Sequence, residues 1–169
     1  MLEPAIKYKE LIPQLYHQTW FDDKYKYWNN TVYHRIKKIE EETWNVHQFV
    51  SVSNGFVIGY IEYYISRATN NVYDLNILNF TDDKITFGAD VMKALKNIFE
   101  KYKFNKLSFE VVIGNPIESQ YDKLIKRYGG KIIGIKENDV RLIDNEYYDV
   151  KLYEILYKDY IQNKKLHRK

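Results

Sequence analysis

The chain has 169 residues, of which 45% are hydrophobic and 17% are aromatic, with only 7 glycines and 3 prolines. This composition excludes a disordered or low-complexity chain and is sufficient for one domain with a sizeable core. The formal net charge of +3 is modest, and basic residues alternate with acids along most of the chain. We therefore expect a single globular domain with N-terminal helices over 1–46, a core over 47–160 and a basic tail over 161–169.

The residue types that are missing exclude several kinds of chemistry. No cysteine is present, so the chain has no disulfide, no thiolate nucleophile and no cysteine-ligated metal. The four histidines have no metal-ligand spacing, and we expect no metal cofactor. No stretch reaches the roughly 20 apolar residues of a membrane span, and the N-terminus lacks an apolar signal core. We expect no membrane association and a cytoplasmic location.

The N-terminal quarter indicates helices. Residues 6–12 are compatible with a short strand or with the start of a helix. Residues 13–28 indicate a helical or helix-turn segment, and we interpret its aromatic stripe as core. After a break at residues 29–31, residues 32–43 predict a second, more polar helix. The acidic triplet Glu40–Glu42 at its end is most simply a solvated face.

The next segment has the alternation of a β-meander. Residues 47–52 and 56–68 predict two strands joined by Asn54-Gly55, a strong short-range hairpin signal. Asn70-Asn71 offers a second turn into a strand over 72–80, which alternates polar and apolar residues. These three strands should therefore pair in antiparallel fashion.

A crossover unit follows the meander. From Gly88 the apolar residues fall on one stripe of a helix, and residues 107–113 form an apolar strand. Asn115-Pro116 opens a further helix, which Gly129-Gly130 ends. A connection of this length allows strands 72–80 and 107–113 to pair in parallel.

Two more strands complete the predicted fold. Residues 131–137 and 146–157 should pair in antiparallel fashion through a loop over 138–145. The fold class is therefore α/β, of the α+β mixed type. Its central sheet is mixed and mostly antiparallel, with helices on both faces.

This order of elements resembles the GNAT superfamily of acyl-CoA-dependent N-acetyltransferases over roughly residues 47–160. The family pattern Q/R-x-x-G-x-G/A, which surrounds the pyrophosphate of coenzyme A, falls on residues 83–88. Only Gly88 matches, so the motif is degenerate. Asn115, after strand 107–113, matches the family asparagine that opens a helix. Residues 148–153, in which the acid Asp149 is followed by alternating apolar residues, resemble the family's last strand.

The resemblance implies acetyl-CoA as cosubstrate and a set of residues that bind it. Strand residues would hold the pantetheine, and backbone amides at the following helix start would hold the pyrophosphate, with Lys84 as a cationic helper. Carboxylates at Asp82, Asp83 and Asp90 would oppose a phosphate unless they point away. The implied cofactor-binding residues are Leu78, Asn79, Phe80, Lys84, Ile85, Thr86, Phe87, Gly88, Ala89, Asn115 and Tyr121.

Acetyl transfer to an amine requires a base for the amine and an acid for the departing thiolate. In a GNAT-like arrangement Asp74 is the first candidate base, acting directly or through water, with Glu62 and Glu110 as alternatives. Tyr121 is the candidate acid, and Tyr128 competes for that assignment. Asn76 could orient the substrate.

The resemblance does not specify the acceptor, which we expect to be an amine of a small molecule or of a protein. Carboxylates at Asp74, Glu62 and Glu40–Glu42 would favour cationic amines such as polyamines, aminoglycosides or protein amino groups. The sequence also leaves open whether a second copy of the chain is a partner, in a homodimer.

Two other functions compete with this one. A GNAT-fold binding or regulatory protein that has lost catalysis would explain the degenerate loop. An RNA-binding protein could use the basic tail over 163–169 with Tyr60 and Tyr64 as stacking surfaces, but Glu62 interrupts that face. We therefore rank nucleic-acid binding last.

Overall fold

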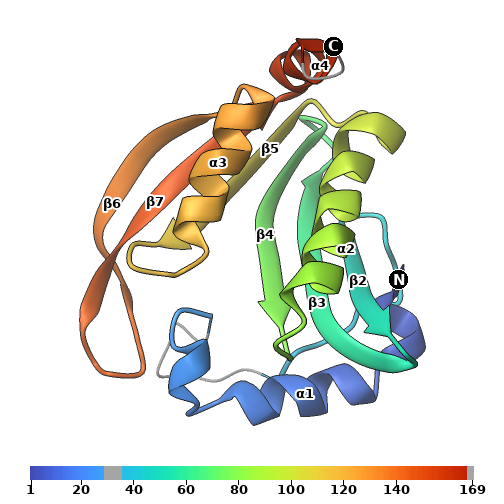
Figure 1. The fold of residues 1–169 in the computed structure, drawn as a ribbon, viewed down its shortest axis with the longest axis vertical. Helices are drawn as coiled ribbons and strands as arrows, with labels where there is room; N and C mark the ends of the chain where they lie inside the picture. The colour runs from blue at the N-terminus through green and yellow to red at the C-terminus, as the bar shows by residue number, and fades with distance from the viewer. Residues whose placement is uncertain (29–35, 167–169) are drawn as a thin grey trace.

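A computed structural model describes residues 1–28 and 36–166. It contains a seven-stranded sheet with the order β1-β2-β3-β4-β5-β7-β6, in which only β4 and β5 run parallel (Figure 1). The strands are β1 (Leu2–Pro4), β2 (Val46–Ser53), β3 (Phe56–Ser66), β4 (Asn71–Asn79), β5 (Lys106–Val112), β6 (Lys131–Arg141) and β7 (Tyr147–Leu156). The helices are α1 (Leu11–Thr19), α2 (Lys84–Lys96), α3 (Glu118–Tyr128) and α4 (Tyr157–Leu166), with short helical turns at Ala5–Tyr8, Asp23–Tyr25 and Asn97–Lys101. The predicted mixed, mostly antiparallel sheet is confirmed.

The turns of the meander follow from local sequence. Asn54 and Gly55 have φ values of 50° and 82°, the paired positive values of a hairpin turn that matches the twist of the strands. Asn70, with φ of 54°, forms the second turn before β4. Gly129 ends α3 in the left-handed conformation with φ of 72°. All three predicted chain reversals are confirmed.

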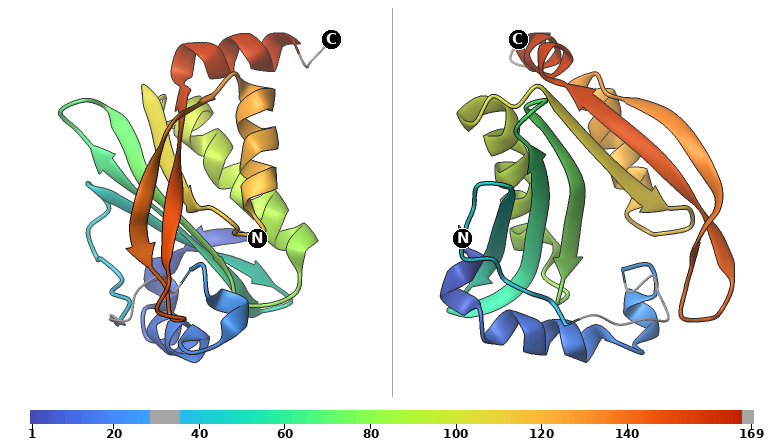
Figure 2. Two further views of the ribbon diagram at one scale, coloured as in Figure 1. Left: turned by 90° about the vertical axis from the view of Figure 1, so that its left-hand side faces the viewer. Right: turned by 180° about the vertical axis from the view of Figure 1, so that it is seen from behind.

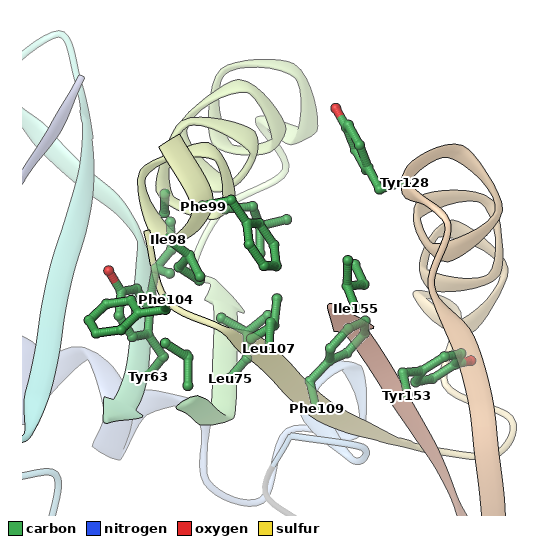
Figure 3. Close-up of a cluster of buried hydrophobic side chains, with 14 of the residues drawn as sticks. Tyr63, Leu75, Ile98, Phe99, Phe104, Leu107, Phe109, Tyr128, Tyr153 and Ile155 are labelled. Atoms are coloured by element: carbon green, nitrogen blue, oxygen red, sulfur yellow. The ribbon is translucent and has the colours of Figure 1, made fainter. Parts of the chain in front are cut away.

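Helices cover both faces of the sheet. Successive residues of β3 point to opposite faces, so Tyr60 packs with Ile12 of α1 while Ile61 joins the core beneath α2 and α3. Figure 2 shows α2 and α3 side by side on one face. The main core between these helices and the sheet contains Phe99, Leu107 and Ile155, all at most 2% exposed (Figure 3).

The central strands separate after a short parallel contact. Asn71 lies opposite Lys106 and Val72 opposite Leu107, and the two strands diverge beyond these pairs (Figure 1). On the other side of β4 the register with β3 shifts after Glu62, where Asp74 takes a positive φ of 51°. This bulge bends β4 away from β5 and leaves an opening in the middle of the sheet.

The N-terminal predictions need two corrections. The helix alternative for residues 6–12 is confirmed, because the chain forms a helical turn and then α1, and β1 was not predicted. The predicted second helix over 32–43 is wrong for residues 36–43, which are not helical. Gln48 explains this, because its side chain donates to the carbonyl of Lys38 and accepts from the amide of Glu40, holding that segment extended along β2. The predicted break at 29–31 lies outside the described residues.

Several element ends also differ from prediction. The helix predicted from Gly88 begins at Lys84, because the Asp83 side chain caps it. The helix predicted from Asn115 begins at Glu118, because the Asn115 side chain caps a turn that precedes the helix. Strand β6 continues to Arg141 through an irregular stretch, so the β6–β7 loop is shorter than expected. Residues 161–166 of the predicted tail belong to α4.

Candidate active site

The opening between β4 and β5 is a cavity of about 380 Å³. One wall is formed by Asp74, Leu75, Asn76 and Ile77 of β4. The edges of β4 and β5 that face this cavity have no ladder partners beyond the two residue pairs at their start, judged from the described chain. Their backbone groups are therefore available to an extended ligand, as at any open strand edge.

The second wall combines β5 with the start of α3. Glu110, Val111 and Val112 line it from β5, followed by Asn115 and Tyr121. Asn115 is 6% exposed, and its side-chain oxygen accepts from the amide of Ile117 at 3.1 Å. Asn115 therefore caps the turn and also faces the cavity.

Asp74 is the carboxylate that the bulge presents to the cavity. It lies at the accessible rim, where a ligand in the cavity can reach it. Partial desolvation and the nearby Glu110 carboxylate raise the pKa of Asp74, whereas Lys136 acts in the opposite direction. A raised pKa makes Asp74 a stronger base than an ordinary aspartate.

The other two candidate bases have different surroundings. Glu110 lines the cavity, but Lys136 Nζ lies 3.0 Å from its carboxylate. Glu62 is 1% exposed and accepts hydrogen bonds from Tyr60 at 2.8 Å and from Gln48 at 2.6 Å. Lys37 completes this cluster at 2.5 Å. Glu62 does not line the cavity itself, but it accepts a hydrogen bond at 3.3 Å from Asn76, which does.

The two tyrosines of α3 lie in different surroundings. Tyr121 lines the cavity, and its ring packs edge-on against Phe109 at 5.1 Å. Burial raises the pKa of the Tyr121 hydroxyl. Tyr128 instead stacks on Tyr160 in the main core, at a centroid distance of 4.9 Å.

The third wall comes from segments that sequence reasoning did not connect with the site. Tyr27 lines this wall together with Trp28, which was interpreted from sequence as core, and with Val140 and Val150 of the β6–β7 hairpin. Tyr64 of β3 also lines the cavity. No local signal marks these positions, because their role depends on how distant segments dock.

The start of α2 differs from the expectation for a pyrophosphate loop. The Asp83 carboxylate accepts from the amide of Thr86 at 2.9 Å, and the amide of Lys84 donates to the Asp82 carbonyl at 2.8 Å. The Phe87 side chain is 6% exposed and packs on Gly59, so it anchors α2 to the sheet. A Cβ at Gly88 would meet nothing within 4 Å, so this face of α2 is open.

The remaining predicted cofactor contacts lie beyond the cavity. Leu78, Asn79 and Phe80 do not line it, and the β4 residues that do come earlier in the strand. Phe80 packs edge-on against Tyr16 of α1, at 5.7 Å. Ile85 is 88% exposed at the start of α2.

The acidic triplet and the predicted stacking surface also lie outside the cavity. None of Glu40–Glu42 lines it, and the Glu41 side chain is 82% exposed, in agreement with a solvated face. Tyr60 is fully buried, so it cannot stack on a nucleic-acid base. Among residues 1–28 and 36–166 no cluster of acids and histidines could hold a metal ion. Within the same ranges no helix is long and apolar enough to cross a membrane.

Comparison with known proteins identifies the fold. No protein-family model matches the sequence, and no curated protein matches it. Among solved structures, spermidine N-acetyltransferase from Vibrio cholerae in complex with CoA and spermine has a TM-score of 0.71 at 19% identity, covering 95% of this chain and 97% of that one. A probable acetyltransferase of the GNAT family from Chromobacterium violaceum has a TM-score of 0.70 at 13% identity, covering 95% and 88%.

These similarities extend over nearly the whole chain. The chain therefore has the GNAT acetyltransferase fold, as the order of its elements predicted. At such low identities the likeness establishes architecture, and the chemistry must be argued from this chain's own residues.

Proposed function

We propose that this protein is an N-acetyltransferase that transfers the acetyl group of acetyl-CoA to a primary amine. The observation that carries the proposal is the cavity between β4 and β5, where Asp74 and Tyr121 face a common space beside open strand edges. The CoA complex of a protein with this fold supports a CoA thioester as donor.

Holding the amine and the thioester in the correct relative position supplies most of the rate acceleration that this reaction needs. An extended pantetheine arm has amide groups that can pair with the free edge of β4, as an added strand does. This pairing would direct the thioester into the cavity beside Leu75 and Ile77. Backbone amides of β4 could then stabilise the oxyanion that forms on the thioester carbonyl.

The proton transfers require one base and one acid. The neutral amine attacks the thioester carbonyl carbon, a C–N bond forms, and Asp74 takes the amine proton directly or through water. The C–S bond then breaks, and the thiolate receives the proton of the Tyr121 hydroxyl. The Tyr121 hydroxyl is protonated at neutral pH and can donate, and because burial raises its pKa, the tyrosinate left behind takes a proton back from water.

The cavity favours a cationic acceptor. Asp74 and Glu110 concentrate cations, and the rings of Tyr27, Trp28 and Tyr64 can bind an ammonium group through their faces. A diamine or polyamine keeps at least one ammonium group when its reacting nitrogen is neutral. The carboxylates and the aromatic rings would both attract that ammonium group. The spermine in the complex of a protein with this fold supports this acceptor class.

A matched pair of amines tests both parts of the proposal. Butylamine and putrescine have the same carbon chain, but only putrescine retains a charge when the attacking nitrogen is neutral. With acetyl-CoA as donor, we expect a larger kcat/KM for putrescine by about tenfold, the effect of one favourable charge interaction. Equal values would remove the cationic acceptor, and no acetylation of any amine would remove the enzymatic function.

A second candidate function is a binding or regulatory protein with this fold that does not transfer acetyl groups. The hydrogen bond between Asp83 and the amide of Thr86 favours it, because this amide is not free for a donor phosphate. Absence of acetyl-CoA binding to the folded protein would support that alternative.

A further inference from the structure

The start of α2 already contains an anion of the chain's own. Helix N-termini attract anions because their first amides are unpaired and their dipole is positive there. Here the Asp83 carboxylate accepts from the amide of Thr86 at 2.9 Å, and the Asp83 carbonyl accepts from the amide of Phe87 at 3.4 Å. The amide of Lys84 is taken up by the Asp82 carbonyl. Most of the donors that a phosphate would use therefore have partners within the chain.

The charge of Asp83 is not neutralised by a close cation. Asp82 has an ion pair with Lys24 at 2.9 Å, but Asp83 is in no ion pair with any residue the structure describes. Its hydrogen bonds with Thr86 lower the pKa of Asp83, so the carboxylate is ionised at neutral pH. An approaching phosphate would meet a full negative charge at the helix start.

The start of α2 lies where the phosphate end of a donor would arrive. Strand β4 lines the cavity from Asp74 to Ile77 and ends at Asn79, and α2 starts at Lys84 (Figure 1). A donor that follows the free edge of β4 with its thioester in the cavity therefore extends toward this helix start. The open space beside Gly88 leaves room for it.

We propose that Asp83 is a specificity-determining residue that weakens recognition of the donor's pyrophosphate. This inference rests on the proposed function. The protein then binds its donor mainly through the pantetheine arm and thioester in the cavity, and only weakly through the phosphates. The degenerate loop is in this view a functional difference rather than a loss of function.

Calorimetric titration with CoA and with pantetheine tests the inference, because pantetheine lacks the pyrophosphate and nucleotide. The variant is Asp83→Asn, since asparagine is also a favoured N-cap and keeps the helix start intact. We expect this variant to bind CoA about tenfold more tightly, the size of effect of one charge at a helix N-terminus. Its affinity for pantetheine should change by less than about twofold.

Two controls keep the result interpretable. Asp82→Asn removes the neighbouring negative charge, which already has an ion pair with Lys24, so it should change CoA affinity by less than Asp83→Asn does. Asp83→Ser, also an N-cap residue, repeats the test if the asparagine variant melts at a lower temperature.

The outcomes separate this inference from the proposed function. If CoA binds to wild type and to Asp83→Asn with equal affinity, or if pantetheine gains as much as CoA, Asp83 has no such role and the proposed function stands. If neither ligand binds to any of the proteins, the proposed function and the inference are both wrong.

Discussion

Lys26 Nζ lies 2.5 Å from Asp144 Oδ2 and joins the segment after α1 to the tip of the β6–β7 hairpin. The ammonium group also donates to the Tyr148 hydroxyl at 2.5 Å and lies 4.7 Å from the centre of its ring. Tyr148 in turn donates to Asp144 at 2.6 Å. These three residues, here termed the clasp, adjoin Tyr27 and Trp28 and hold the third wall of the cavity in place.

Breaking the clasp should weaken binding of the acceptor. In Lys26→Met we expect the KM for the amine to rise about three- to tenfold, because the aromatic wall loses its link to the hairpin. The KM for acetyl-CoA should stay within about twofold. Steady-state kinetics with putrescine measures both, and Lys38→Met, which alters an exposed lysine away from the cavity, is the control. A rise in the KM for acetyl-CoA alone would place the clasp on the donor side instead.

The clasp should not respond to pH near neutrality. Hydrogen bonds from Lys26 and then from Tyr148 lower the pKa of Asp144 to about 2. Asp144 therefore stays ionised throughout the pH range in which the enzyme can be assayed, and the pH profile should report other groups.

The acid limb of the pH profile should report Asp74. This base must be ionised to accept a proton, so kcat/KM rises with pH through its pKa, which lies above the usual aspartate value of about 3.9. Glu110→Gln removes a nearby negative charge and leaves Lys136 paired with Asp139 alone, and both changes lower the pKa of Asp74. The acid limb should therefore move to lower pH in this variant. A limb that stays in place would show that another group titrates there.

Tyr121→Phe should lower kcat about a hundredfold, since the departing thiolate loses its proton donor. The variant keeps the aromatic ring that packs against Phe109, so thermal stability should change little. Tyr128→Phe, in the same helix but directed into the core, is the matched control and should retain full activity. Equal activities of the two variants would exclude Tyr121 as the acid.

Lys37→Met should destabilise the fold strongly. Glu62 is 1% exposed, and loss of its ion pair with Lys37 would leave a buried carboxylate without a cation. The expected cost is about 3–5 kcal/mol in the free energy of unfolding, measured by urea denaturation. Lys38→Met, beside it in sequence but 80% exposed, should cost less than about 0.5 kcal/mol. If the two variants have equal stabilities, Glu62 does not depend on Lys37.

The sequence predicts the parts of this fold that local rules determine. Asn54-Gly55 specifies a hairpin by itself, and the changes of hydrophobic period mark the order β4, α2, β5, α3. The candidate base Asp74 and acid Tyr121 follow from that order together with the family resemblance. Both residues line the same cavity, and their roles stay predictions.

The rest depends on contacts between distant segments. Nothing in the sequence shows that Asp74 takes a positive φ and forms a bulge. The sequence therefore predicts ligand contacts at residues 78–80, near the end of β4, whereas residues 74–77 line the cavity. Residues 36–43 have a helical pattern, but the Gln48 side chain and the pair of Lys37 with Glu62 keep them extended. From sequence, Trp28 is interpreted as a core residue, because the residues that face it across the cavity are remote in sequence.

The most direct test of the account is mass-spectrometric detection of N-acetylated putrescine after incubation with acetyl-CoA, for wild type and for Asp74→Asn. Asparagine preserves the shape of the bulge residue and tolerates its positive φ, so the change removes only the base. We predict acetylated product from wild type and a rate about a hundredfold lower from the variant. Absence of product with wild type across a panel of amines, or equal rates for the two proteins, would contradict the central claim that this cavity transfers acetyl groups with Asp74 as base.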